Sequence, residues 1–599
     1  MRMLKSLLLG SAAGVVAVAG AQAADLPVKA KPVEYVKICN LYGDGFFYLP
    51  GTETCVRLGG NMQADYFYNA SGGQQPLYFA NGFANTGGAQ DRTTSAWATR
   101  ARVDLGLDSR TQTSYGTLRT YSQMRIDTLD QGTTTPAVVR GFIQWAGFTF
   151  GHARSYTDPE GMAGGGGGFL MLTQCQFCSD TVGGGTNQIA YTWELGSGMT
   201  LTLGADERRN KPLVNLNQNT VLAANVESPT VSVGINPNNN RAGENFPNPY
   251  LAFRVSQEWG SASAAIVGNY NAGTYYGGFS NATTASTQAL ASGQITPGCT
   301  DQQGSLGAGT ITAGGTNNGV EIGGTSLCNH PSDKWGYAAL FGAMIKLPMI
   351  APGDRIGGFI GYGVGASAYA GGANMGSPAL FGAGNQVALG VVTDGVYCTP
   401  QSQVVAGATN CTGNLELTTA WAIGAGFEHF WTPTLATKLY GMYGEHNYNA
   451  AVVNGGWMCG NTGSGVPLGT GVSTNANNVG VGGIVTLGPT GIPGQGRCDP
   501  SFNMKQVSGQ IDWRPGGGIR LAVEATWTGI GTAFAGQQLV LERNSTTSNG
   551  TLGSRPAASV NYGGTAAAQG ITGTTYLAKD QSIVSLYFRA QKGFGGVGE

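Results

Sequence analysis

Residues 95–108, Ser-Ala-Trp-Ala-Thr-Arg-Ala-Arg-Val-Asp-Leu-Gly-Leu-Asp, decide the fold class. Apolar or small residues occupy every second position from Trp97 to Leu107, and the positions between and after them carry four charges at Arg100, Arg102, Asp104 and Asp108. Successive side chains of a β-strand point to opposite faces, so this strand has one apolar face and one charged face. Moving Arg100 and Arg102 into lipid by a one-residue shift would cost roughly 4–8 kcal/mol. The pattern therefore predicts a transmembrane β-strand whose charged face points into a wet interior.

The same alternation recurs along the chain and predicts sixteen strands. Short links such as 109–111 and 146–147 alternate with long links such as 272–334. A soluble β-sandwich also alternates, but aromatic residues near the strand ends and the two classes of link favour a barrel. The predicted fold class is all-β: a 16-stranded antiparallel transmembrane β-barrel with short periplasmic turns, long extracellular loops and an infolded third loop. The predicted strands are 55–68, 95–108, 112–127, 137–145, 148–154, 187–195, 199–206, 249–258, 262–271, 335–347, 355–368, 416–430, 435–446, 503–513, 518–528 and 580–590.

The N-terminus carries the features of an export signal. A basic start, an apolar run over 7–19 and the sequence Ala21-Gln22-Ala23 predict a signal peptide over 1–23. The following 24–54 is expected to be a periplasmic lead, and 55–590 the barrel. The mature chain contains no apolar run of membrane-spanning length, so a transmembrane helix is not expected.

Composition narrows the function classes. The chain has 599 residues, of which 100 are glycine and 11% are charged, and its formal net charge is −1. Nothing in this balance indicates nucleic-acid binding. The mean hydropathy of −0.07 suits a barrel, because only one face of each strand meets lipid.

Ten cysteines in an exported chain predict disulfides, although sequence alone does not fix their connectivity. Taken in order they form five neighbouring pairs. The C-x-x-C at 175–178 leaves redox or metal chemistry as an alternative, but no second C-x-x-C exists for zinc. The candidate disulfide cysteines are Cys39, Cys55, Cys175, Cys178, Cys299, Cys328, Cys398, Cys411, Cys459 and Cys498.

A barrel of sixteen strands encloses an aqueous channel. The third long link, 155–186, is the candidate constriction loop, and its acidic residues are Asp158, Glu160 and Asp180. Acid on the loop facing base on the wall would set up a field that sorts solutes by size and charge. The alternative is that these charges are solvated lumen groups without a selective role. The predicted pore-lining basic residues are Arg100, Arg102, Arg119, Arg125, Arg140, His152 and Arg154.

Catalysis has little support in the sequence. The four histidines stand in no metal motif, no G-x-S-x-G elbow occurs, and the glycine run 164–168 lacks a phosphate-loop pattern. We therefore expect no enzyme activity, no metal, no cofactor and no nucleic-acid partner.

Residues 31–60 carry a family resemblance. The stretches Lys31-Pro-Val-Glu-Tyr-Val-Lys-Ile-Cys39, Gly45-Phe-Phe-Tyr-Leu-Pro-Gly-Thr52 and Cys55-Val-Arg-Leu-Gly-Gly60 closely resemble the mature start of the alphaproteobacterial porin family, of the rhizobial and Brucella type. Residues 140–152 resemble that family's strand before its constriction loop.

The resemblance implies a usually trimeric outer-membrane porin for passive diffusion of small hydrophilic solutes and ions, with the loop after the fifth strand folded inward. The long, cysteine-rich late loops depart from the family, and so does the tail after Phe594. Membrane lipid is the other expected partner. The alternative function is a secreted or surface-attached glycine-rich β protein that acts as an adhesin or structural layer.

Overall fold

The structure is a computed structural model. It describes residues 37–70, 74, 76, 89–90, 95–129, 133–162, 169–173, 175–179, 181, 184–215, 239–243, 245–274, 330–372, 379–383, 386–397, 412–455, 485–487, 499–536, 538–541 and 574–595. The expected signal peptide at 1–23 lies outside these ranges. Among the described residues, no helix has the length and apolar character needed to cross a membrane.

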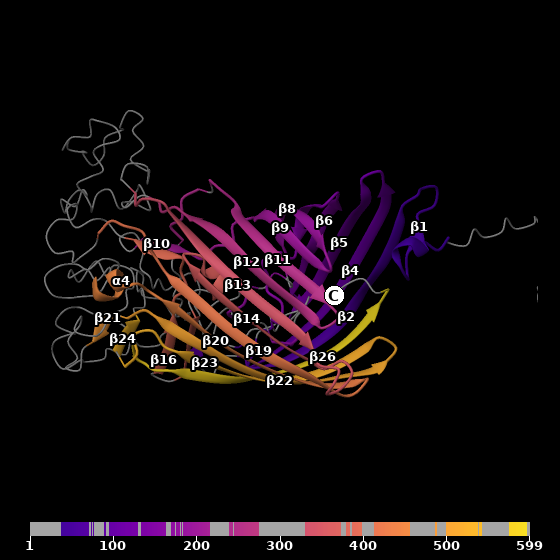
Figure 1. The fold of residues 1–599 in the computed structure, drawn as a ribbon. Helices are drawn as coiled ribbons and strands as arrows, with labels where there is room; N and C mark the ends of the chain where they lie inside the picture. Colours follow the sequence, from indigo (N-terminus) through magenta and orange to yellow (C-terminus); the bar gives the residue numbers. More distant parts are fainter. Residues whose placement is uncertain are drawn as a thin grey trace, which may run out of the picture.

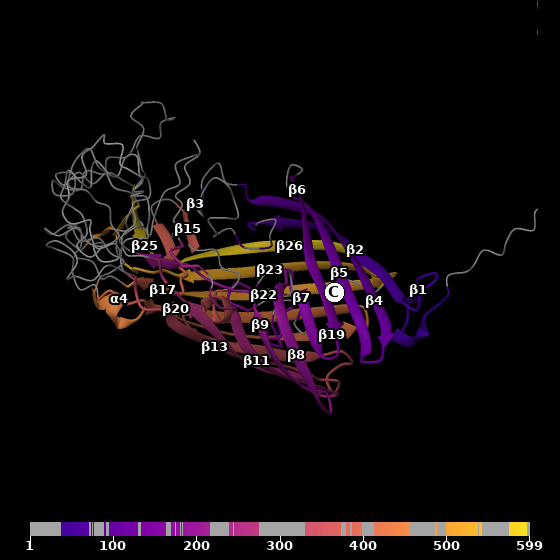
Figure 2. The same ribbon diagram turned by 90° about the horizontal axis from the view of Figure 1, so that it is seen from above.

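Sixteen antiparallel strands form a closed ring (Figures 1 and 2). Each strand pairs with its neighbours, and the last strand pairs with the first through Gly60–Tyr68 and Leu586–Phe594. The predicted fold class is therefore confirmed. The strands are β2 (Cys55–Tyr68), β4 (Trp97–Thr113), β5 (Gly116–Leu129), β6 (Thr133–Trp145), β7 (Phe148–Ala153), β8 (Thr186–Gly196), β9 (Met199–Asp206), β11 (Asn248–Gln257), β12 (Gly260–Asn271), β13 (Lys334–Lys346), β14 (Arg355–Val364), β19 (Thr419–Thr432), β20 (Leu435–Asn447), β22 (Phe502–Gly516), β23 (Ile519–Gly531) and β26 (Gln581–Phe594).

Several predicted strand ends are wrong by three to five residues, among them the end of the last strand, which is Phe594 rather than residue 590. Two of these errors have a clear structural reason. The turn expected at 109–111 is part of the β4–β5 ladder, which continues to the pair Thr113 and Gly116, because these residues keep hydrogen-bonding across the two strands. The strand expected over 355–368 ends at Val364, since Gly365 takes a left-handed φ of +59°. The chain then forms the short helix α3 (Ser367–Ala370).

The barrel has apolar side chains on its outer surface and polar ones inside, as the alternation predicts. On β4, Trp97 and Leu105 are 55% and 40% exposed on the outer face, whereas Arg100 and Asp104 are each 3% exposed on the inner face. Lipid contact explains the outer face, and a polar lumen explains the inner one.

Aromatic side chains gather toward both rims of the ring. Tyr115 packs against Trp145 beside a short turn. At the opposite end, Tyr66 packs against Trp97 and Phe588. Two such belts are typical of barrels that span a bilayer.

Smaller elements lie at the two ends of the ring (Figure 1). At the short-turn end, β1 (Phe47–Tyr48) pairs with the start of β2, and a disulfide joins Cys39, which precedes β1, to Cys55 at the start of β2. At the long-loop end, two small sheets and the helix α4 (Ala450–Gly455) form a cap. The strands of these sheets are β10 (Leu213–Asn215), β17 (Gly395–Tyr397), β18 (Glu416–Leu417), β3 (Ala89–Gln90), β15 (Ala379–Ala383), β16 (Gln386–Gly390), β21 (Val485–Leu487), β24 (Gln538–Leu541) and β25 (Thr574–Ala578).

Candidate pore and constriction

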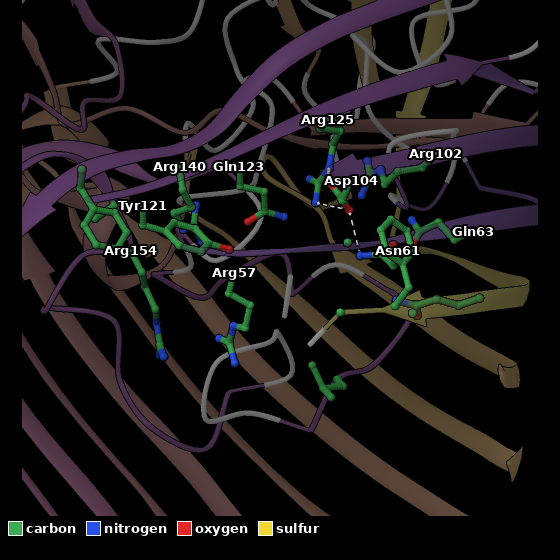
Figure 3. A pocket seen from close by; sticks show the side chains of 18 of the residues that line it. Arg57, Asn61, Gln63, Arg102, Asp104, Tyr121, Gln123, Arg125, Arg140 and Arg154 are labelled. Carbon is green, nitrogen blue, oxygen red and sulfur yellow. Dashed lines mark hydrogen bonds and ion pairs between the residues drawn. The ribbon is translucent and has the colours of Figure 1, made fainter. Parts of the chain in front are cut away.

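The lumen contains a cavity of about 1000 Å³ between the short turns and the inward-folded third link (Figure 3). Asp104 is the one carboxylate among the described residues that line it. The wall is therefore strongly basic at this level of the barrel. Its ten arginines are Arg57, Arg102, Arg119, Arg125, Arg140, Arg154, Arg254, Arg514, Arg520 and Arg589.

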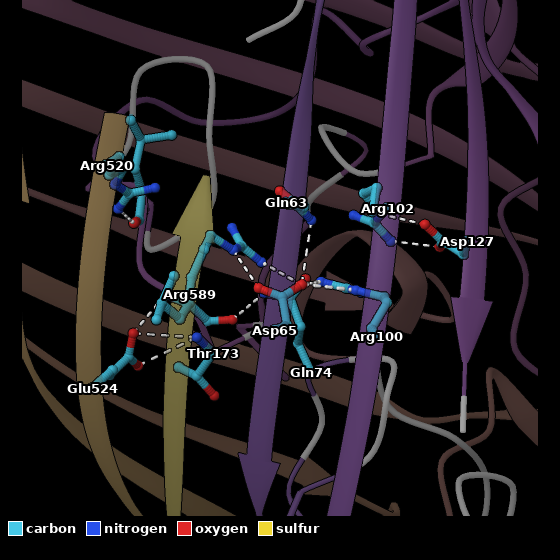
Figure 4. Close-up of polar contacts among 12 residues, drawn as sticks. Gln63, Asp65, Gln74, Arg100, Arg102, Asp127, Thr173, Arg520, Glu524 and Arg589 are labelled. Carbon is cyan, nitrogen blue, oxygen red and sulfur yellow. Dashed lines mark hydrogen bonds and ion pairs between the residues drawn. The ribbon is translucent and has the colours of Figure 1, made fainter. Parts of the chain in front are cut away.

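Cross-strand register decides which wall charges meet. Asp65 on β2 lies opposite Arg100 on β4 and Arg589 on β26. It forms ion pairs with both, each with an N···O distance of 2.6 Å (Figure 4). The Arg100 side chain is 2% exposed, and Arg100 is not among the residues that line the cavity.

Three other predicted basic residues pair with carboxylates of the wall itself. Arg102 binds Asp127 on the facing strand at 2.5 Å (Figure 4). The other two pairs are Arg125 with Asp104 at 2.8 Å (Figure 3) and Arg119 with Asp108 at 3.0 Å. These four wall arginines are therefore neutralised in part by neighbouring strands.

The first part of the third link lies against β11, β12 and β13, across the barrel from the β2–β4 wall. Glu160 forms an ion pair with Arg254 on β11 and accepts a hydrogen bond from Ser261 on β12. A Cβ atom at Gly342 on β13 would lie 2.1 Å from the Glu160 carbonyl oxygen, so only glycine permits this approach. Both contacts anchor the segment inside the barrel.

Asp158 holds this link together at its base. It accepts hydrogen bonds from the Thr181 N–H at 2.8 Å and from the Ser179 hydroxyl at 3.3 Å. It also lies 3.7 Å from Arg154 and Arg209. Asp158 is fully buried, so its charge is compensated locally. The third predicted acid, Asp180, lies outside the described residues.

The second part of the link crosses to β20, β23 and β26. The N–H groups of Leu172 and Thr173 donate to Glu524, and Figure 4 shows Thr173 beside this carboxylate. The Thr173 hydroxyl donates to Tyr587. Phe169 packs its ring 5.6 Å from that of Tyr440. The link therefore passes through the barrel from one wall to the other.

Two of the five predicted cysteine pairs lie within the described residues, and both are disulfides. Cys175 and Cys178 form a disulfide within the third link, and Cys39 pairs with Cys55. The remaining candidates, Cys299, Cys328, Cys398, Cys411, Cys459 and Cys498, lie outside the described residues.

Two further predicted residues contact the third link. Arg140 lines the cavity and donates to the carbonyl oxygens of Val139 and Thr181. His152 is bonded through its ring nitrogens to Asn187 and to the carbonyl of Gly184. His152 is not among the residues that line the cavity.

Five cavity arginines were missing from the predicted set: Arg57, Arg254, Arg514, Arg520 and Arg589. Four of them stand at inward positions of predicted strands, and Arg514 directly follows the strand predicted over 503–513 and continues its alternation. The alternation is therefore the signal that could have found them. The prediction is limited to strands near the third link, whereas the closed ring places β26 next to β2, with β23 and β22 following in turn around the wall.

An apolar cluster joins the third link to the cap at the long-loop end. Phe177 of the link, Leu389 and Val392 after β14, and Phe502 and Phe534 near β22 and β23 are all buried in one cluster. The long loops therefore pack over and into this end of the lumen.

Polar contacts hold the cap as well. Asp394 accepts hydrogen bonds from the N–H groups of Ser367 and Lys211 and forms an ion pair with Arg241. Burial lowers the pKa of the Lys211 side chain to about 8, although Asp394 opposes the shift.

Within the described ranges, no three histidine, cysteine, aspartate or glutamate side chains are placed to hold a metal ion.

The closed ring, its apolar exterior and the link that crosses its lumen define a porin-type β-barrel of the bacterial outer membrane. A family model described as "Porin subfamily" matches residues 25–553, and the chain belongs to this family. Membership in this family of channel proteins agrees with the expectation that the chain is not an enzyme.

Two relatives illustrate the sequence similarity. The porin Omp2a of Brucella ovis is 33% identical over 221 residues, which cover 34% of this chain and 59% of that protein. The porin Omp2a of Brucella abortus (strain 2308) is 44% identical over 126 residues, which cover 21% and 34% of the two chains. The match thus spans less than two thirds of the length of either relative.

Two solved structures are also similar. The outer membrane channel DcaP of Acinetobacter baumannii has a TM-score of 0.45 at 11% identity, with 91% of this chain and 99% of that chain covered. The trimer form of the Vibrio cholerae outer membrane protein OmpT has a TM-score of 0.36 at 8% identity, with 91% and 100% covered.

Proposed function

We propose that the chain forms a water-filled channel through the outer membrane for passive diffusion of small hydrophilic solutes and ions. One observation carries the proposal: a closed transmembrane ring has an arginine-lined cavity of about 1000 Å³ inside it. A polar, water-filled lumen of this kind lets hydrated solutes cross the membrane, because they need not enter the hydrocarbon of the bilayer.

In this proposal the third link is the constriction. Its anchors on both walls, Glu160 with Arg254 and Thr173 with Glu524, support a fixed position across the lumen. The link that lies across the lumen and the wall arginines that line the cavity then set the size and charge of solutes that pass.

The family match begins at residue 25, which supports removal of 1–23 before the barrel assembles. A homotrimer in lipid is the proposed assembly, supported by the resemblance of residues 31–60 to alphaproteobacterial porins.

Planar-bilayer recording of detergent-extracted protein tests the channel. We expect large, long-lived conductance steps, often in groups of three. Protein denatured by heat serves as the control and should give no steps. Folded protein that inserts without conducting would refute the proposal, and release from membranes by urea would support a surface-attached protein instead.

A further inference from the structure

We propose that the arginine-lined cavity is a binding site for small anions with phosphate or carboxylate groups, and that it makes the channel select anions over cations. This inference rests on the proposed channel function and names its preferred solutes. It combines three observations: shared carboxylates, an unpartnered guanidinium nitrogen and the position of the cavity.

The first observation is that several wall carboxylates are shared between cations. Asp65 lies between Arg100 and Arg589, so one negative charge faces two positive ones. The other shared carboxylates are Asp108, between Arg110 and Arg119, and Asp512, among Arg514, Arg520 and Lys438. Pairing therefore leaves excess positive charge on the wall.

The second observation is the side chain of Arg57. It lines the cavity from β2, and its Nε atom is buried without a hydrogen-bond partner in the described part of the chain. Its guanidinium carbon lies 4.9 Å from the ring centre of Phe46, which holds the group by cation–π contact. A planar guanidinium can donate two parallel hydrogen bonds to a carboxylate or phosphate.

The third observation is where the cavity lies. Tyr156 and Leu170 of the third link line one side of it, and Gly518 in a short turn lines another. The arginine side chains reach this space from neighbouring strands (Figure 3). A solute that crosses the barrel must therefore pass a basic region enclosed by low-dielectric walls, which concentrates anions. Because the site is inside the ring, its ligand is a soluble anion rather than a lipid headgroup.

Reversal potentials in a potassium chloride gradient test the selectivity. We expect chloride to be more permeant than potassium. In Arg57→Gln the permeability ratio of chloride to potassium should fall by about twofold, the effect of one charge at close range in a wet site. Arg57 is the chosen position because its neutralisation leaves no carboxylate without a partner.

Lys579→Gln is the matched control. Lys579 is exposed at the other end of the barrel and does not line the cavity, so the same loss of charge should leave the ratio unchanged. Equal falls in both variants, or a wild-type channel that prefers potassium, would overturn the inference while leaving the channel itself intact.

Binding is measured separately by calorimetry with inorganic pyrophosphate and detergent-solubilised protein. The wild type and Lys579→Gln should bind pyrophosphate, and Arg57→Gln should bind it several-fold more weakly. This measurement needs no conduction, so it still decides on the anion site if the bilayer experiment shows no channel. Absence of pyrophosphate binding to the folded wild type would refute the site.

Discussion

Glu524 is the residue whose replacement should loosen the third link at the far wall. Its carboxylate is fully buried and accepts hydrogen bonds from the N–H groups of Leu172 and Thr173. Gln510 also accepts from Leu172, at 3.1 Å, and would keep part of the anchor. At about 1.5–3 kcal/mol for each hydrogen bond to a charged group, Glu524→Ala should weaken the anchor by about 3–5 kcal/mol. A loss of this size should loosen the link at Leu172 and Thr173, while Tyr587 and the packing of Phe169 on Tyr440 still hold it in the lumen.

The assay is single-channel conductance in a planar bilayer. Glu524→Ala should conduct more current per channel, with noisier open levels, because the loosened link moves more freely across the lumen. Glu524→Gln keeps one acceptor oxygen and should show a smaller change. Glu194→Gln, at an exposed position of β8, is the control and should behave as the wild type.

The prediction about Glu524 requires that each variant is folded. The shift of the unheated barrel on a denaturing gel first establishes that each variant is folded. A folded Glu524→Ala channel with wild-type conductance and noise would show that the link does not depend on this anchor, or that it does not narrow the path.

Three further outcomes follow from single contacts. Gly342→Ala should displace Glu160 and destabilise the folded state by about 1–3 kcal/mol in urea titrations, whereas Gly509→Ala, with open space around it, should not. Cys39→Ser opens a loop with a sequence separation of 16 and should cost about 3 kcal/mol, which thermal melts with and without reductant would measure. For Lys211, whose pKa falls from 10.5 to about 8 on folding, the folded state binds fewer protons between these values. Stability of the cap should therefore rise with pH across that window, and protease resistance of Lys211→Met should lack the rise.

The fold could be predicted from sequence because the alternation within each strand is enough to identify it as a barrel strand. A lipid-facing arginine is so unfavourable that the alternation in 95–108 fixes the inward face without knowledge of any neighbour. The same penalty applies to every strand, so sixteen segments were located despite errors at single ends. The turn after β4 was misplaced because Ser109–Thr111 continues both the alternation and the ladder.

The pore could be predicted only in part, because its contacts join residues far apart in the chain. Alternation placed Glu524 inside the barrel, yet nothing in the sequence links it to Leu172. Likewise, Arg100 is expected to line the lumen but is buried against Asp65, which also binds Arg589 on the strand that closes the ring. Register and loop path decide such contacts, and both depend on the whole barrel.

The net charge of the whole chain is close to zero, although the described residues that line the cavity inside the barrel include ten arginines and one carboxylate. In a closed antiparallel ring, each inward side chain has neighbours on two strands, so one carboxylate can bridge two arginines, as Asp65 does. Meanwhile carboxylates such as Asp354 and Asp394 are engaged outside the strands, at the short turns and in the cap. The negative charges that balance the chain are therefore not all beside the arginines that line the cavity. It is this separation of charge along the barrel axis, rather than the total charge, that gives the lumen its preference for anions in our proposal.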